Sequence, residues 1–350
     1  MSKPAGATFS ADYLFDSAPE PGQLGSVCAD IEWARLPLPF ALNHVNCWLL
    51  GEPGEQVLVD TGVANKGTLD LWQKSLGSAN GVDELRLPKQ LLVTHFHPDH
   101  MGLAGWFSSQ GVAVLGSEIE VSVSLRVWAI DDASYGELYG TWYAGHGLPR
   151  KVVEAVRNSG NRYRGIVHEP PSESQWRYLK NGQKIELGNF EYEVITGRGH
   201  APDMLMLYRD ADHVLIAADQ VLPAITPNVS VMPQLTDTNP LESFLQTLTA
   251  LRELPEDTLV LPSHGLPFKG LRERLDFLAE HHEHRLADIM SACDRPICAY
   301  ELFDVLFRRE LDAQQTAFAL GESLAHLRYL EHQGLLKSEV QDGVCRFIRS

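Results

Sequence analysis

The chain has 350 residues, of which 44% are hydrophobic, so it is long enough for one large α/β domain with a sizeable core and a small appendage. Its formal net charge of −17 argues against a nucleic-acid partner, because binding to phosphate backbones requires a local surplus of Lys and Arg. No apolar stretch approaches the roughly 18 to 20 residues of a membrane span, so no membrane association is expected.

Cysteine usage and the start of the chain bear on the compartment. The cysteines are scattered and form no CxxC pair; they are Cys28, Cys47, Cys293, Cys298 and Cys345. This usage favours reduced, mostly buried thiols over a disulfide framework. Residues 1–25 contain no basic segment followed by an apolar one, so we expect no secretory signal. Together these features predict a cytoplasmic protein.

Short apolar segments rich in Val, Leu and Ile and bounded by turn residues are typical of buried strands. They are residues 56–62, 90–95, 112–117, 192–200, 213–220 and 259–265. Helical spacing is found between them, at residues 65–76 and 239–255, and the second segment opens with Asn239 as an N-cap followed by Pro240. The alternation of strands and helices predicts a layered α/β fold.

Most of these predicted strands end in a residue that can bind a metal or transfer a proton. The residues are Asp60, His95, His200, Asp219 and His264. Strand ends on a rigid sheet converge polar groups at one edge, where α/β folds build their sites. The sequence therefore predicts a site at this edge.

Residues 118–180 interrupt the strand–helix alternation and are predicted to form a helical insert. Tyr135, Tyr139, Trp142 and Tyr143 follow helical spacing on one face, although two glycines weaken the helix. One interpretation is that this aromatic face packs against the main body of the protein. The other is that it walls a pocket above the strand ends, and the two are compatible.

After about residue 290 the pattern changes again. Residues 299–307 and 316–336 read as helices, Gly334 is a candidate stop, and a hairpin turning at "QDG" follows. We therefore predict a catalytic domain over residues 1–290 and a winged-helix-like domain over residues 291–350. The second domain has more acidic than basic residues, so a role in packing or homodimerisation is favoured over DNA binding.

The stretch "THFHPDH" (residues 94–100) concentrates metal ligands directly after an apolar run. His95 and His97, two residues apart, can point to the same side of an extended segment, and Asp99 and His100 can face a second position after the turn at Pro98. We predict that His95, His97 and His200 hold a first metal ion. Asp99, His100 and His264 would hold a second, and Asp219 would join the two, since a carboxylate buried in "HVLIAADQV" needs such a partner.

The HxHxDH pattern, followed in order by a His, an Asp and a His, resembles the metallo-β-lactamase fold superfamily. "VLVDTG" at residues 57–62 is similar to that superfamily's early strand. The resemblance spans residues 30–270 and implies an αββα sandwich. It also implies that Asp60 orients the metal loop by hydrogen bonding and does not bind metal. With Asp99 in "HPDH" and a shared aspartate, the sequence resembles the glyoxalase II, lactonase and ribonuclease Z branches. The basic glutathione-binding residues of glyoxalase II have no clear counterpart here.

This reading predicts a hydrolase with two divalent ions, Zn²⁺ first and Fe or Mn as alternatives, and no organic cofactor. A hydroxide shared by the ions would attack a carbonyl, and Asp99 would orient the nucleophile and carry a proton. We expect a small acyl substrate, first a thioester of the acyl-CoA or glutathione type, with an ester or lactone as the next choice.

Other classes remain open at this stage. A single-strand endoribonuclease would need a basic channel, and the candidate residues are Arg150, Lys151, Arg157, Arg162 and Arg164. A persulfide dioxygenase would hold a single iron, and a binding protein without catalysis would have lost a ligand. His44 and residues 226–231 are candidates to line the cleft, whereas "HHEHR" (residues 281–285) is expected on the solvated face of a helix.

Overall fold

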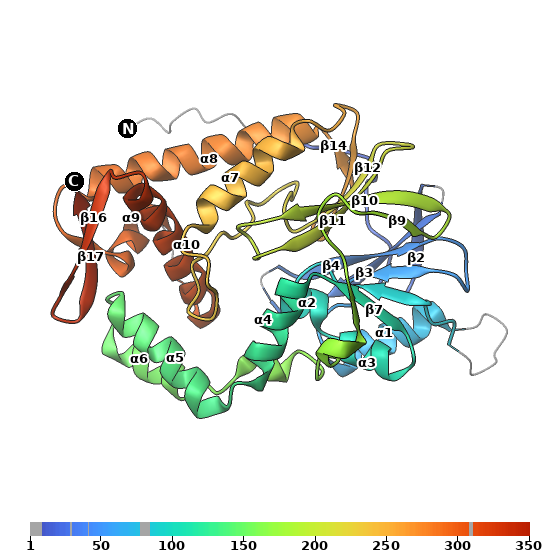
Figure 1. Cartoon of the computed structure of the whole chain (residues 1–350), viewed down its shortest axis with the longest axis horizontal. Helices are drawn as coiled ribbons and strands as arrows, with labels where there is room; N and C mark the ends of the chain where they lie inside the picture. The colour runs from blue at the N-terminus through green and yellow to red at the C-terminus, as the bar shows by residue number, and fades with distance from the viewer. Residues whose placement is uncertain (1–8, 29, 41, 78–84, 308–310) are drawn as a thin grey trace.

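The computed structural model describes residues 9–28, 30–40, 42–77, 85–307 and 311–350. Within them the chain forms two seven-stranded sheets and one three-stranded sheet. The two large sheets lie face to face, with helices on both outer sides (Figure 1). This is the predicted αββα sandwich, and the fold class is confirmed. The first eight residues of the predicted catalytic domain lie outside the described residues.

The N-terminal sheet is antiparallel in its first half and parallel in its second half. Its strands, in spatial order, are β2 (Leu24–Cys28), β3 (Ile31–Pro37), β4 (His44–Leu50), β5 (Val57–Val59), β6 (Gln90–Leu92), β7 (Ala113–Gly116) and β8 (Trp176–Tyr178). β8 corrects the predicted insert, because its pairing with β7 ends the insert before residue 176.

The second sheet is antiparallel except for the pair β12–β13. Its strands, in spatial order, are β1 (Asp12–Tyr13), β14 (Phe268–Lys269), β13 (Leu259–Pro262), β12 (Val214–Ala218), β11 (Met204–Arg209), β10 (Phe190–Gly197) and β9 (Lys184–Leu187). All six strands predicted from apolar runs are present. Those that the prediction missed include β2, β3, β8, β9 and β11.

Helices cover the outer face of each sheet (Figure 1). Those packed on or beside the N-terminal sheet are α1 (Lys66–Leu76), α2 (Pro98–Met101), α3 (Ala104–Ser109) and α4 (Glu118–Ala129). Those on the second sheet are α7 (Pro240–Leu251) and α8 (Leu271–Ala292). The helix predicted at residues 65–76 is α1, and the one that opens at Pro240 is α7.

Strand β12 shows how the sequence builds these layers. Val214 and Ile216 point into the core between the two sheets, whereas Leu215 and Ala217 point toward α7 and α8. Side chains alternate between the faces of a strand, so a strand buried on both sides must be apolar throughout. The uninterrupted run "VLIAA" meets that requirement and places Asp219 at the strand end.

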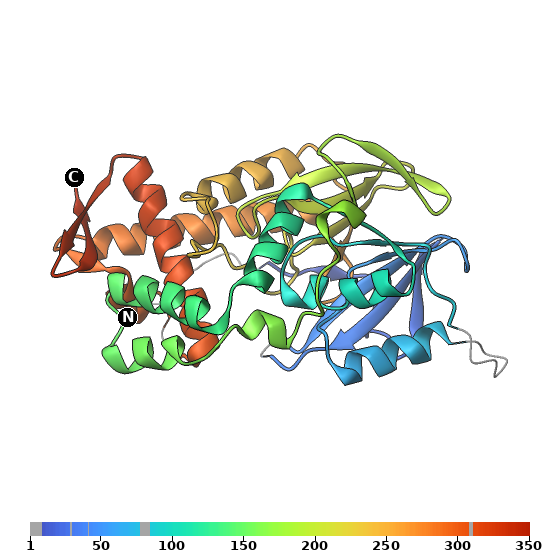
Figure 2. The same cartoon turned by 60° about the horizontal axis from the view of Figure 1, so that its bottom comes forward.

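The insert packs against the C-terminal region (Figure 2). It contains α5 (Asp132–Gly145), α6 (Arg150–Arg157) and short 3-10 helices at Arg162–Gly165 and Glu173–Gln175. Tyr139 and Tyr143 of the aromatic face are buried in one cluster with Leu320 and Phe347. The aromatic face therefore serves packing, as the first interpretation predicted, but its partner is the C-terminal region and not the main body.

The C-terminal region contains helices and a small sheet. Its elements are β15 (Ile297–Cys298), a 3-10 helix (Ala299–Leu302), α9 (Phe303–Leu306), α10 (Ala313–His332), β16 (Leu336–Gln341) and β17 (Val344–Arg349). The hairpin turns at Asp342 and Gly343, both with positive φ, as the "QDG" signal predicted. The winged-helix assignment and the domain boundary at residue 290 stay predictions.

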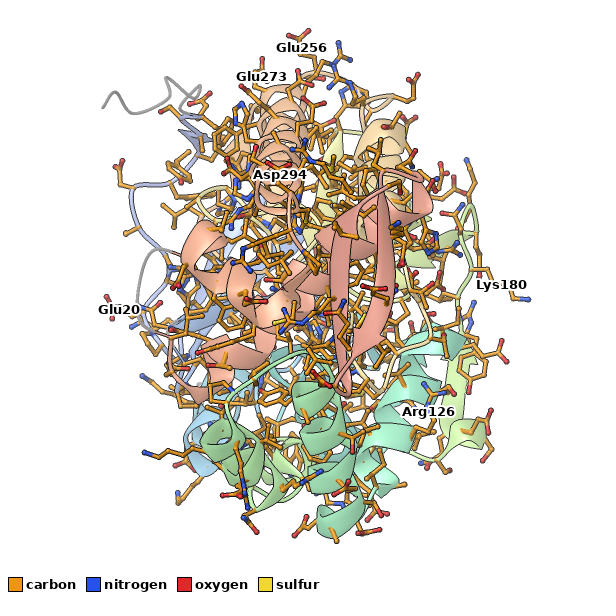
Figure 3. All side chains as sticks on the ribbon, turned by 90° about the vertical axis from the view of Figure 1, so that its left-hand side faces the viewer. Glu20, Arg126, Lys180, Glu256, Glu273 and Asp294 are labelled. Carbon is orange, nitrogen blue, oxygen red and sulfur yellow. The ribbon has the colours of Figure 1, made fainter. Side chains whose placement is uncertain are left out.

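Charged side chains line the outside of the molecule. Figure 3 shows Glu20, Lys180 and Glu256 pointing outward at its periphery. Across the part of the chain that the structure describes, no helix is long and apolar enough to cross a lipid bilayer.

Candidate metal centre

The predicted ligands come from separate elements that meet at one edge of the sandwich. His95 and His97 follow β6, and Asp99 and His100 lie in α2, which Pro98 starts at its first position. The other three follow β10, β12 and β13; they are His200, Asp219 and His264. The structure therefore brings all seven residues together from both large sheets.

The seven side chains form two groups whose candidate ligand atoms lie within 4.8 Å of one another. We call the first group His95, His97, His200 and Asp219, and the second group Asp99, His100 and His264. Asp219 also reaches the second group, because its Oδ1 lies 3.3 Å from His264 Nε2 and 3.6 Å from His100 Nε2. Its other oxygen lies 3.3 Å from His200 Nε2.

Hydrogen bonds determine which nitrogen of each imidazole faces the centre. The Nδ1–H of His200 donates to the carbonyl of Asn228 (2.9 Å), and the Nδ1–H of His264 donates to the carbonyl of His44 (2.6 Å). The Nδ1–H of His100 donates to the Asp60 carboxylate (2.7 Å). An imidazole that binds a metal ion is neutral and carries one N–H, so in that form the Nε2 atom of each of these rings presents a lone pair.

The lone pairs of His100 and His264 face carboxylate oxygens, which can only accept hydrogen bonds. Among the described residues, the buried atoms His100 Nε2, His264 Nε2 and Asp219 Oδ1 have no hydrogen-bond partner. Asp99 Oδ2 lies 3.7 Å from His100 Nε2 and 3.5 Å from His264 Nε2. Buried polar atoms are normally satisfied, so an arrangement of lone pairs around a shared space fits a cation between them.

Asp60 lies behind the second group. Its carboxylate accepts the backbone N–H of Thr94 (2.8 Å) and its hydroxyl, besides the ring of His100. Thr94 in turn contacts Nδ1 of His95 (2.9 Å). Asp60 has a φ of 63°, in the left-handed region that aspartate tolerates better than most residues other than glycine. The side chain thus contacts His100 of the second group directly and reaches His95 of the first group only through Thr94; this hydrogen bonding is what the sequence resemblance implied.

Asp219 is directed into the centre by an irregularity in its strand. The β12–β13 register shifts between Ile216 and Ala218, and Ala218 has a φ of 46°. A bulge of this kind changes the direction of the side chain that follows it. Gly199 has a similar role before His200: its φ is 97°, and a Cβ there would lie 2.5 Å from Phe244.

The electrostatics of the centre favour positive charge. Burial and the neighbouring imidazoles His100 and His97 hold the pKa of His95 well below its usual range. Burial would also lower the pKa of His100, but the carboxylates of Asp60, Asp99 and Asp219 raise it to about 10. Burial opposes ionisation of Asp219, yet His264 and His100 hold its pKa well below the usual range. The carboxylates therefore attract a proton or a metal ion.

Sequence reasoning missed several groups that hold the centre. Thr94 and the carbonyl groups of His44 and Asn228 contact the backs of the ligands. His44 and residues 226–231 had been singled out only as candidates to line the cleft. Glu120 was missed altogether: it is buried, and its oxygens accept backbone N–H groups next to the ligands. Its only signal was an acidic residue among the apolar ones of α4.

The histidines of "HHEHR" correct another prediction. They were expected to be solvated, but His282 is only 1% exposed and packs between α7, α8 and α10, against Phe244 and His326. His282 lies in α8, a long helix that covers the second sheet, so one face of α8 must be buried.

Several of the basic residues considered for a nucleic-acid channel have local partners. Arg150 pairs with Glu154 (2.7 Å) and Arg157 with Glu137 (3.2 Å). Arg164 donates to the carbonyl groups at the end of α4. Two of the five candidate charges, those of Arg150 and Arg157, are therefore paired locally with carboxylates.

Comparison with known proteins agrees with this geometry. Residues 41–264 match the family model described as "Metallo-beta-lactamase superfamily", and residues 286–350 match "Metallo-beta-lactamase-like, C-terminal domain". The chain belongs to the metallo-beta-lactamase superfamily. This membership, together with a metallo-hydrolase relative described below, identifies it as a metal-dependent hydrolase.

Two solved structures are similar over nearly the whole chain. A beta-lactamase domain protein from Burkholderia ambifaria is 36% identical, with a TM-score of 0.86, covering 97% of this chain and 98% of that one. A metallo-beta-lactamase family protein from Thermus thermophilus is 30% identical, with a TM-score of 0.77, covering 93% of this chain and 100% of that one. The probable metallo-hydrolase YqjP of Bacillus subtilis (strain 168) is 23% identical over 88% of this chain and 94% of its own.

Proposed function

We propose that the chain hydrolyses a small acyl substrate, a thioester first, at a centre of two divalent metal ions. The first group would hold one ion, the second group the other, and Asp219 would be shared. The observation that carries the proposal is the convergence of unpartnered, buried Nε2 and carboxylate oxygen atoms on a common space.

The donor atoms fit the proposed ions. Imidazole nitrogen with carboxylate oxygen suits Zn²⁺, and iron and manganese accept the same ligand types. The rings of His100, His200 and His264 are each anchored through Nδ1, which directs Nε2 toward the centre. Anchored rings lose little freedom when an ion binds, which favours affinity.

Two bound divalent ions would supply a hydroxide nucleophile near neutral pH and polarise the oxygen of the scissile carbonyl. The side chains of the protein would orient the metal ligands and the attacking water, and would carry protons. Asp60 keeps the His100 ring in one tautomer. Asp99 is less buried than the histidine it faces, so its carboxylate can align the attacking water and take up its proton.

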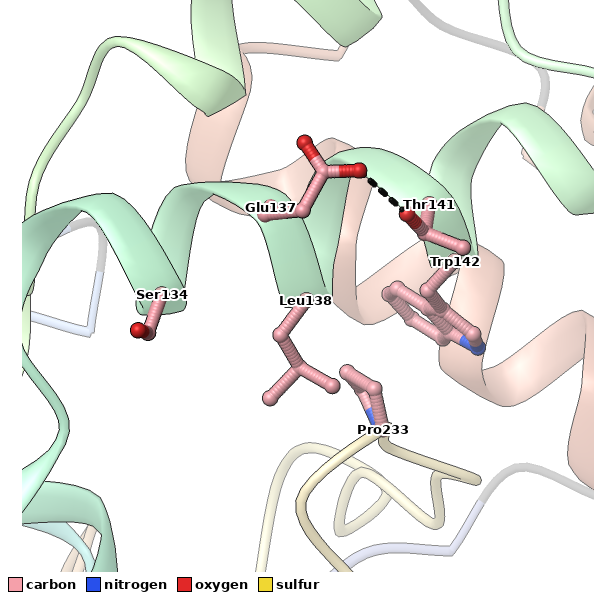
Figure 4. Close-up of a pocket in the computed structure, with 6 residues that line it drawn as sticks. All are labelled: Ser134, Glu137, Leu138, Thr141, Trp142 and Pro233. Carbon is pink, nitrogen blue, oxygen red and sulfur yellow. Dashed lines mark hydrogen bonds between the residues drawn. The ribbon is translucent and has the colours of Figure 1, made fainter.

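The choice of a thioester rests on the ligand set, which resembles glyoxalase II, and on the insert. An open hollow of about 570 Å³ lies between α5 and the loop at Pro233 (Figure 4). Leu138, Trp142 and Pro233 give it apolar surface that an acyl group can cover. The loop that contains Pro233 continues back to Asn228, whose carbonyl anchors His200. An ester or a lactone is the next choice, since the same nucleophile attacks it.

The test combines metal analysis with a substrate panel. The purified chain, reconstituted with Zn²⁺, Fe²⁺ or Mn²⁺, is assayed against acyl-CoA and glutathione thioesters, simple esters and lactones. We expect two ions per chain and the highest kcat/KM with a thioester. Turnover confined to lactones would overturn the thioester choice, and a single iron with persulfide oxidation would overturn hydrolysis. Cleavage of single-stranded RNA alone would overturn the acyl substrate.

A further inference from the structure

Glu120 is an ionisable residue buried at the start of α4, with 1% of its surface exposed. Among the described residues no Lys, Arg or His forms an ion pair with it. Instead one carboxylate oxygen accepts the N–H of Phe96 (3.0 Å) and the other accepts the N–H of Asp203 (2.6 Å). Burial raises the pKa of Glu120 to about 8, and these two N–H groups oppose the rise because they stabilise the anion.

The two N–H groups belong to the two loops that hold the histidines of the first group. Phe96 lies between His95 and His97, after a strand of the N-terminal sheet, and Asp203 lies three residues after His200, beyond a strand of the second sheet. His97 Nδ1 lies 3.0 Å from Nε2 of both other rings. One carboxylate therefore joins the backbones of loops from different sheets at the point where their ligand atoms meet.

Neighbouring contacts fasten the same two loops to the insert. The carbonyl of Phe96 accepts the hydroxyl of Tyr163 (2.7 Å), so both polar backbone groups of that residue are held. The Asp203 side chain accepts the hydroxyl of Ser117 (2.7 Å) and pairs with Arg198 (3.2 Å). Ser117, Glu120 and Tyr163 all lie in or next to the insert, so the insert has a role beyond packing the C-terminal region.

We infer that Glu120 is the positioning residue of the first group: it sets the distance between the His95–His97 loop and the His200 loop, and so tunes the affinity of that group for its ion. The inference rests on the proposed metal centre. It gives the first group a counterpart of Asp60, which contacts His100 of the second group directly. Glu120 touches no ligand ring and acts through the backbone.

Glu120→Gln is the first test. The amide keeps the shape of the side chain, but one of its ends is an NH₂ donor, so one of the two backbone N–H groups loses its acceptor. Metal-free protein is titrated with Co²⁺, following heat and visible absorption, because the absorption reports the ligand geometry of each ion. We expect one of the two binding steps to weaken about 10- to 100-fold, with an altered absorption band, while the other step is unchanged.

Glu118→Gln is the matched control, because Glu118 is exposed on the same helical turn. It should leave both binding steps as in the unsubstituted protein. If Glu120→Gln is insoluble, Glu120→Asp, whose side chain is one methylene shorter, is titrated in its place. If the Glu120 variant binds Co²⁺ with both steps unchanged, or with both steps weakened equally, the inference is overturned. If the unsubstituted protein itself fails to bind two ions, the proposed metal centre is overturned as well, which separates the two failures.

Discussion

The chain buries histidines in two places, and their surroundings differ. In the candidate metal centre the imidazoles meet the carboxylates of Asp99 and Asp219, and the lone pairs of both converge. Between α8 and α10, His282 and His326 also lie together, 3.1 Å apart. No Asp or Glu side chain forms an ion pair with either of them in the described residues.

The second pair is linked by hydrogen bonds, and among the described residues only the Nε2 of His282 in this pair has no partner. The Nδ1–H of His326 donates to the carbonyl of Glu322 (2.8 Å), so its Nε2 accepts the Nδ1–H of His282. Burial, with no opposing carboxylate, lowers the pKa of His326 to about 4 and holds that of His282 well below its usual range. These rings are neutral core residues. The comparison shows that convergent carboxylates, and not a density of histidines, distinguish the metal centre.

The largest expected effect comes from removing the shared carboxylate. Asp219→Asn should lower kcat/KM by more than about 100-fold. Replacing a residue that only hydrogen-bonds to a metal ligand already costs about 10- to 100-fold in metal affinity or activity. The assay uses the best substrate of the panel. Asp210→Asn, in the exposed turn before β12, is the control and should be close to wild type. A loss of less than tenfold for Asp219→Asn would contradict the role of this residue.

Metal removal should lower the free energy of unfolding only through the candidate metal centre, and not through the pair of His282 and His326. Zn²⁺ at 100 times its Kd should raise the free energy of unfolding by about 2.7 kcal/mol for each bound ion over chelator-treated protein. Chemical denaturation with and without the ion measures the difference. The same increment is expected for His326→Leu, since the pair between α8 and α10 binds no metal. If the increment shrinks in that variant, the two histidine regions are not separate in function.

The pair between α8 and α10 should contribute stability and not activity. His326→Leu leaves the buried Nδ1–H of His282 without an acceptor, which should cost about 1–3 kcal/mol in the free energy of unfolding. Replacing both histidines by Leu should recover part of that loss, because neither polar group then remains. His284→Gln, exposed on the same helix, should stay within about 0.5 kcal/mol of wild type. Loss of bound metal in His326→Leu would contradict the distinction.

The smallest expected effect is a change in how steeply the free energy of unfolding depends on pH. Folded His326 stays neutral down to about pH 4, whereas the unfolded residue takes up a proton near pH 6.5. The unfolded state therefore binds more protons between these values, so stability falls as the pH drops through this window. His326→Leu should flatten the slope by at most about 1.4 kcal/mol per pH unit. Denaturation at pH 7, 6 and 5 measures it, and an unchanged slope would show that His326 is already protonated in the fold.

How much could be predicted differs between kinds of feature. The six apolar strands and the residues at their ends were correct because a strand buried on both faces must be apolar, and polar residues interrupt it only at the edge. The strands β2 and β3 were missed because they mix polar and apolar residues, as in "LGSVC" and "IEWARLP". Their burial is decided by partners far along the chain.

The sequence by itself determined the layered fold class and the set of candidate ligands, since the residue types and their order carry that information. Only the tertiary structure decided which ring nitrogens point inward, that Glu120 joins two ligand loops and that His282 is buried. Such features depend on backbone groups and on contacts between residues distant in the chain. A one-dimensional pattern records which side chains are present, whereas hydrogen-bond direction and burial arise when the two sheets close on each other.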